Sequence, residues 1–142
     1  MKDVNNALKH LSDYGTIVLH DCNPEKEEYT VVPMPNPIPW VYPTPGAPGY
    51  QIYHGDVYRT IVWFRSRRPD VTTVTVKDID GGGVGVIFKK PSKLVIPPTD
   101  NTWETFEKGR ETFLGLMTSK EFREEYMAVS YTHLTLPTIL RV

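Results

Sequence analysis

His20, Asp21 and Cys22 follow one another directly after the apolar run 16–19 (TIVL). A free imidazole titrates close to neutral pH, so His20 is suited to removing a proton there. A carboxylate is a ligand that hard divalent cations prefer, and such a cation lowers the pKa of a bound hydroxyl. We predict His20 and Asp21 as catalytic residues and Asp21 as a metal ligand. The alternative is that the pair only ends a strand and caps nearby amides. Cys22 is expected in the core.

The run 16–19 is short, rich in β-branched residues and preceded by a glycine, which predicts a buried parallel strand. Ligands of open α/β sheets bind outside the carboxyl ends of strands. Such a strand would hold His20 and Asp21 at one of these ends.

Segment 24–55 holds eight of the 13 prolines, so neither a helix nor a central strand can persist in it. It also carries Trp40, Tyr42 and Tyr53, which we predict as substrate-binding residues. A connection of this length is typical of a functional lid or binding loop. A packed insertion anchored by its aromatic side chains is an equally open alternative.

The remaining patterns predict helices, strands and turns around this strand. Helices are expected over 3–11, 56–67, 103–116 and 118–126, and strands over 71–77 and 84–89, joined by a glycine turn at 78–83. Asp56 and Thr118 are expected to cap helices. Because glycines 81–83 lead into a strand, they are not a phosphate-binding loop. The arginines at 65, 67 and 68 are expected to be a solvated helix end.

Length and composition bound the class of protein. The chain has 142 residues, which fits one domain, and a net charge of −1, which implies no nucleic-acid partner. Its single cysteine excludes an internal disulfide and fits a reducing cytoplasm. No run reaches the ~18–20 apolar residues of a membrane helix. We therefore expect a cytoplasmic α/β protein with no membrane partner.

Both ends of the sequence are unusual. Residues 129–138 (VSYTHLTLPT) are the standard-code translation of a transposon-end adapter used for sequencing libraries, so we interpret 129–142 as an artefactual tail. A genuine β-prone tail is the alternative. No strand precedes helix 3–11, so the chain is expected to begin inside an α/β unit. The expected organisation is a half-domain over 1–90, a linker with helices over 91–128, and the tail.

Three segments carry a family resemblance. ALKHLSDYGTIVLHD (7–21) resembles the helix, turn and fifth strand of class I S-adenosylmethionine-dependent methyltransferases, although Tyr14 replaces the first glycine of the turn. GDVYRTIVWFRSRRPDVTTVTVKDIDGGGVGVI (55–87) resembles the following helix and the terminal reversed hairpin. FEKGRETFLGLMTSKEF (106–122) resembles a C-terminal segment of bacterial members called methyltransferase family 24.

The resemblance implies a partial Rossmann-like methyltransferase fold. Its mixed sheet would have about three strands, one strand plus a C-terminal β-hairpin, with flanking helices and the proline-rich and aromatic insertion 24–55. In metal-dependent members, acidic and amide residues after the fifth strand hold a divalent ion beside the acceptor oxygen, which Asp21 would match.

The implied function is a truncated methyltransferase acting on a small molecule or a saccharide. The family's glycine-rich cofactor loop has no counterpart here, so no cofactor-binding residue is assigned. S-adenosylmethionine would bind only the full-length protein, and the chain alone would be inactive. Two alternatives stay open: a non-enzymatic binding or partner domain that uses the insertion, and an accessory segment associated with a glycosyltransferase.

Overall fold

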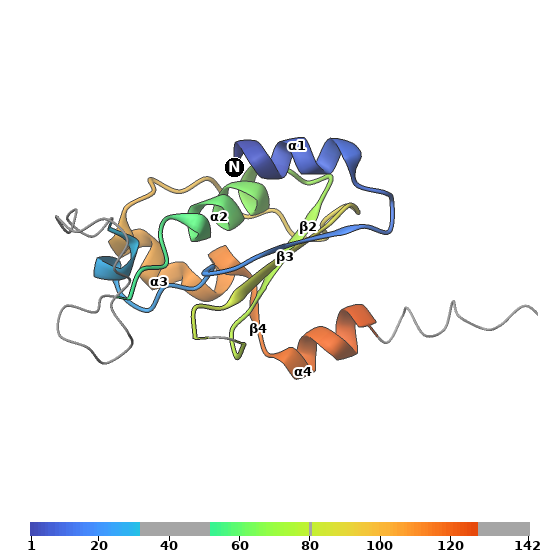
Figure 1. Ribbon diagram of the computed structural model, residues 1–142. Coiled ribbons are helices and arrows are strands. Elements are labelled where there is room, and N and C mark those ends of the chain that lie inside the picture. Colours follow the sequence, from blue (N-terminus) through green and yellow to red (C-terminus); the bar gives the residue numbers. More distant parts are fainter. Residues whose placement is uncertain (32–51, 80, 128–142) are drawn as a thin grey trace, which may run out of the picture.

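The computed structural model describes residues 1–31, 52–79 and 81–127, which build a mixed α/β structure around one sheet (Figure 1). The four strands lie in the order β1-β3-β2-β4, and they are β1 (Thr16–Leu19), β2 (Thr72–Val76), β3 (Val84–Phe88) and β4 (Leu116–Met117). β3 pairs antiparallel with both β1 and β2, so β1 and β2 run parallel to each other. β4 pairs parallel with β2, which adds a strand to the three expected.

Helices cover both faces of the sheet (Figure 1). The helical elements are α1 (Lys2–His10), η1 (Glu27–Thr30), α2 (Val57–Arg67), α3 (Trp103–Leu114), α4 (Ser119–Phe122) and the π-helical turn η2 (Arg123–Met127). α1 and α2 pack on one face, where Val4, Leu8 and Phe64 meet Ile87 of β3. α4 and η2 pack on the other face through Phe122 and Tyr126. The prediction of α/β architecture is confirmed.

The prediction that the strand over 16–19 is buried is wrong, although this strand does run parallel to β2 in the sheet. β1 is the outermost strand of the described sheet, and it pairs antiparallel with β3. Ile17 and Leu19 pack towards the α1–α2 face, whereas Val18 points away and is 64% exposed. A four-residue apolar run carries no information on strand direction, and a strand at a sheet edge can leave one face uncovered.

The helix predicted over 103–116 ends two residues earlier, and this makes room for the fourth strand. Gly115 has a φ of 58° and closes α3 through hydrogen bonds from its N–H to the carbonyls of Glu111 and Thr112. This left-handed conformation favours glycine because it lacks a Cβ. The chain then turns to lay β4 beside β2.

Two predicted helix caps have different outcomes. Asp56 precedes α2 but makes no capping hydrogen bond through its side chain, so that prediction is wrong. Thr118 forms a complete capping box: its hydroxyl accepts from the Glu121 N–H, and the Glu121 carboxylate accepts from the Thr118 N–H at 2.7 Å. The regular helix after this cap ends at Phe122, where η2 takes over.

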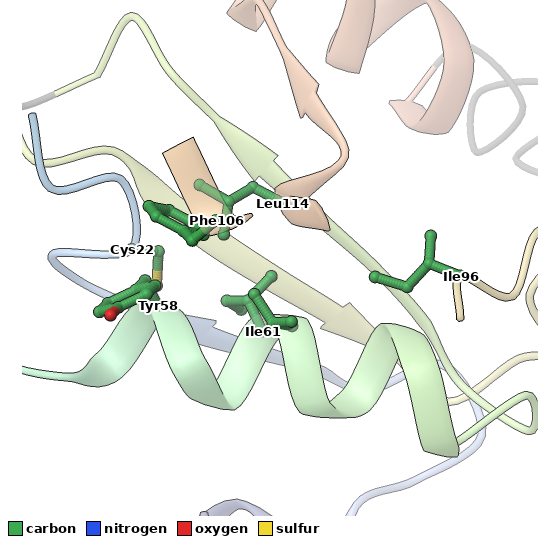
Figure 2. Packing of buried hydrophobic residues seen from close by; sticks show 7 residues of the cluster. Cys22, Tyr58, Ile61, Ile96, Phe106 and Leu114 are labelled. Carbon is green, nitrogen blue, oxygen red and sulfur yellow. The ribbon is translucent and has the colours of Figure 1, made fainter. Parts of the chain in front are cut away.

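The largest core cluster surrounds α2 and is shown in Figure 2. Ile61 and Tyr58 of α2 pack against Phe106 and Leu114 of α3. On the sheet side, a Cβ on Gly85 would lie 2.6 Å from Ile61 Cδ1 and 2.7 Å from Cys22 Sγ. A glycine in the central strand therefore allows this cluster to press directly against the sheet.

Candidate functional site

The candidate site lies where the chain leaves β1 and meets the hairpin turn between β2 and β3. Asp21 has a φ of 58°, a left-handed conformation that aspartate tolerates better than most residues. The next two residues are tied to the turn: Cys22 N–H donates to Gly83 O at 3.1 Å, and Asn23 N–H donates to Gly82 O at 2.6 Å. These bonds fix the backbone that carries His20 and Asp21.

The structure brings the two predicted catalytic side chains together. His20 Nδ1 lies 3.0 Å from Asp21 Oδ1, within hydrogen-bonding distance. The His20 side chain is 59% exposed and that of Asp21 is 27% exposed, so a ligand can reach the imidazole while the carboxylate lies deeper. When the carboxylate accepts a hydrogen bond from Nδ1–H, the proton of the neutral ring stays on Nδ1 and Nε2 is the basic nitrogen. This is the orientation that a general base requires.

His54 lies close to Asp21, and the sequence analysis did not predict His54 as a site residue. A Cβ on Gly82 would lie 2.6 Å from Asp21 Oδ1 and 3.3 Å from His54 Nε2, so both side chains converge over this glycine. His54 is held by its N–H, which donates to Tyr29 O at 2.8 Å, and by edge-on packing of its ring on Tyr29. Its Nδ1 is buried with no hydrogen-bond partner among the described residues.

Arg110 of α3 holds the loop that follows the site through hydrogen bonds. Its Nη1 donates to Asn23 Oδ1 at 3.1 Å and also to Pro24 O. The guanidinium lies over the rings of Trp103 and Phe106, with 5.3 and 4.9 Å to the ring centroids. Desolvation lowers the pKa of Arg110. This arginine positions the segment that follows His20 and Asp21.

The predicted substrate-binding aromatic residues have different outcomes. Trp40 and Tyr42 lie outside the described residues. Tyr53 is described, directly precedes His54 in the chain and is 45% exposed, as its neighbour Ile52 is at 42%. An aromatic and an aliphatic side chain are therefore available to a ligand next to His54.

The described residues do not form a complete site for a divalent metal ion, and the prediction of Asp21 as a metal ligand stays a prediction. Among the described residues, no three His, Cys, Asp or Glu side chains are placed to bind one ion. Hard divalent cations take six or more oxygen ligands, whereas Asp21 offers one carboxylate beside two imidazoles. We derive no step through a metal from this arrangement.

Cys22 lies directly behind the site and is completely buried, which confirms its prediction as a core residue. Its Sγ lies 3.4 Å from Leu19 O. Burial raises the pKa of the thiol from 9.0 to about 12.

This thiol makes stability depend on pH. In the unfolded chain it releases its proton near pH 9.0, whereas in the folded chain it keeps the proton to about 12. The unfolded state then binds fewer protons, so the free energy of unfolding should fall by about 1.4 kcal/mol per pH unit in this window. Urea denaturation at several pH values checks this against Cys22→Ala, which lacks the thiol and keeps every other titrating group. Equal pH slopes for the two proteins would show that the folded thiol ionises normally.

The fold and site define a mixed α/β protein with a histidine–aspartate pair at the carboxyl end of an outer strand. Comparisons of the chain with protein-family models, with curated proteins and with solved structures gave no significant match. Within the described ranges, no helix combines the length and apolar character needed to cross a bilayer.

Proposed function

We propose that the chain forms the second half of an S-adenosylmethionine-dependent methyltransferase domain that acts on a hydroxyl of a small molecule or saccharide. The observation that supports this most directly is the strand order. β1 and β2 are parallel, connected through α2, and separated by the antiparallel β3. A strand, a helix and a reversed hairpin in one sheet are what the resemblance of 7–21 and 55–87 implies.

The same strand order accounts for the position of His20 and Asp21. Both follow the carboxyl end of β1, which is where open α/β sheets bind ligands. The exposed imidazole can meet an acceptor, and the less exposed carboxylate 3.0 Å away can hold its orientation. The pair therefore lies where the chemistry of this fold class would need a base.

The chemistry assigned to these residues is proton removal. The cofactor, when bound, supplies an electrophilic methyl group. His20 Nε2 would take the proton of the acceptor hydroxyl, and the Asp21 carboxylate would stabilise the imidazolium that forms. The proton later passes to solvent, because His20 is exposed.

The test begins with the contiguous gene in the source DNA. We expect a glycine-rich cofactor loop upstream of Met1, and we expect the joined protein to bind S-adenosylmethionine in equilibrium dialysis. The present chain alone should show no binding. An assembled gene without such a loop would contradict the proposal.

The same material tests the binding-domain alternative. Residues 1–128 expressed alone should aggregate or melt without cooperativity if they are half of a larger domain, since the small core leaves little stability. A monomer that melts cooperatively would instead favour a non-enzymatic domain.

A further inference from the structure

An open pocket of about 460 Å³ lies at the end of the sheet opposite β1. Its walls come from β2 and β4, the C-terminal half of α2, the segment 90–94 and η2. β3 and β2 separate β1 from this end of the sheet. A strand that joins the sheet beside β1 would therefore not fill the pocket, so the pocket does not depend on the proposed missing half.

Arg65 forms the polar end of this pocket. Its Nε donates to Thr112 O at 3.2 Å, and its Nη1 donates to Thr73 O. The carbonyl of Thr73 lies on the edge of β2 that continues to β4, where Thr75 N–H donates to Gly115 O at 3.2 Å. The guanidinium thus binds the Thr73 carbonyl, which a further residue of β4 would bind if that strand were longer. The interpretation of Arg65 as part of a solvated helix end is wrong.

Glycine at position 115 makes this placement of Arg65 feasible. A Cβ there would lie 2.6 Å from Arg65 Cζ, so a side chain would displace the guanidinium. Both backbone bonds use Nε and Nη1, which leaves the Nη2 donors of Arg65 without a hydrogen-bond partner in the described part of the chain.

The pocket carries an excess of positive charge. Arg65, Lys90 and Lys93 line it, and Glu125 is the one acidic side chain among the lining residues. None of the three basic side chains forms an ion pair with another described residue. Lys90 Nζ lies instead over the ring of Tyr126, 5.3 Å from its centroid. Burial opposes the charge of Arg65 and lowers its pKa, so a bound anion would compensate a desolvated cation.

The rest of the pocket is apolar. Its lining includes Val74 of β2, Leu94, Leu116, Met117 and the ring of Tyr126. Leu94 is 56% exposed although it lies beside this apolar wall. Small-molecule sites commonly combine such a wall with a few convergent polar groups.

We propose that this pocket binds a small organic anion whose carboxylate or phosphate lies against Arg65, Lys90 and Lys93. The apolar body of the ligand packs against Val74, Leu94 and Met117. Guanidinium groups bind both kinds of oxyanion through paired N–H donors, so the two share one recognition chemistry. The pocket is distinct from the site at His20 and Asp21, and the proposal does not rest on methyl transfer.

The experiment titrates the full chain with phenyl phosphate, benzoate and inorganic phosphate at constant ionic strength, by isothermal calorimetry. We expect saturable one-to-one binding of phenyl phosphate or benzoate, and weaker binding of inorganic phosphate, which lacks the apolar body. The stronger of the two aromatic probes identifies the oxyanion. Inorganic phosphate binding as tightly as both aromatic probes would overturn the role of the apolar wall.

Lysine variants assign the binding to this pocket. Lys93→Ala removes an exposed charge from the lining of the pocket, and we expect about tenfold weaker binding, which is about 1.4 kcal/mol. Lys9→Ala is the matched control, because Lys9 is an exposed lysine of α1 on another element. Absence of saturable binding, or equal weakening by both variants, would overturn the proposal.

Discussion

Replacing His20 with alanine is expected to slow methyl transfer by the proposed full-length enzyme by about 10²–10⁴-fold, the usual contribution of a general base. The loss should fall on kcat, because the imidazole acts on the proton of an acceptor that is already bound. The rise of activity with pH that reports ionisation of this imidazole should disappear as well. Methyl transfer measured across a range of pH checks both effects.

Two further variants make this result specific. His10→Ala is the matched control, since His10 is an exposed histidine at the end of α1 and should leave kcat unchanged. Asp21→Asn keeps the shape of the side chain but removes the charge that lies 3.0 Å from His20, so it should also lower kcat. If His20→Ala kept the pH dependence of the wild type, His54 would become the candidate base, and His54→Gln would test it.

Replacing Phe64 with alanine is expected to lower the free energy of unfolding by about 3–5 kcal/mol, as for other fully buried phenylalanines. Phe64 is 0% exposed and joins three elements, because it packs with Val4 and Leu8 of α1 and with Ile87 of β3. The cavity would loosen the attachment of α1 to the sheet. Urea denaturation of the joined protein, followed by far-ultraviolet circular dichroism, measures the loss.

Tyr14→Ala is the control for the Phe64 variant. Tyr14 is 99% exposed, so its truncation should change the free energy of unfolding by less than about 0.5 kcal/mol. A change below about 1 kcal/mol in Phe64→Ala would mean that α1, α2 and β3 do not share a cooperative core.

Local patterns predicted α2 and the hairpin of β2 and β3 well. Apolar side chains at helical spacing and β-branched residues around glycines act within one turn or one strand, so the sequence contains their signal. β4 was missed because two residues cannot show a period. The position of Gly115 decides where α3 stops, and it was read as helix interior.

The positions of His54 and Arg65 could not be predicted from the sequence, because they depend on contacts between residues that are far apart in the chain. His20 and Asp21 are adjacent in the sequence, and their position after an apolar run was enough to predict both as site residues, although not their contact. His54 also lies over Gly82, although it is more than thirty residues from Asp21 in the sequence. No sequence pattern around His54 predicts this contact. Arg65 shows the same limit, because a basic residue in the last helical turn usually faces solvent. Only the packing of α2 beside β2 and α3 gives it backbone carbonyl partners.

The two outer strands of the sheet differ in length and in what lies beside them. At one end, β4 covers part of β2, and the Arg65 guanidinium occupies the next carbonyl on that edge. At the other end, β1 has β3 as its one strand neighbour in the described chain. Arg65 thus stops β4 from extending along β2, whereas no described strand lies on the outer side of β1. A polypeptide designed to complete this protein by strand addition should be attached on the β1 side.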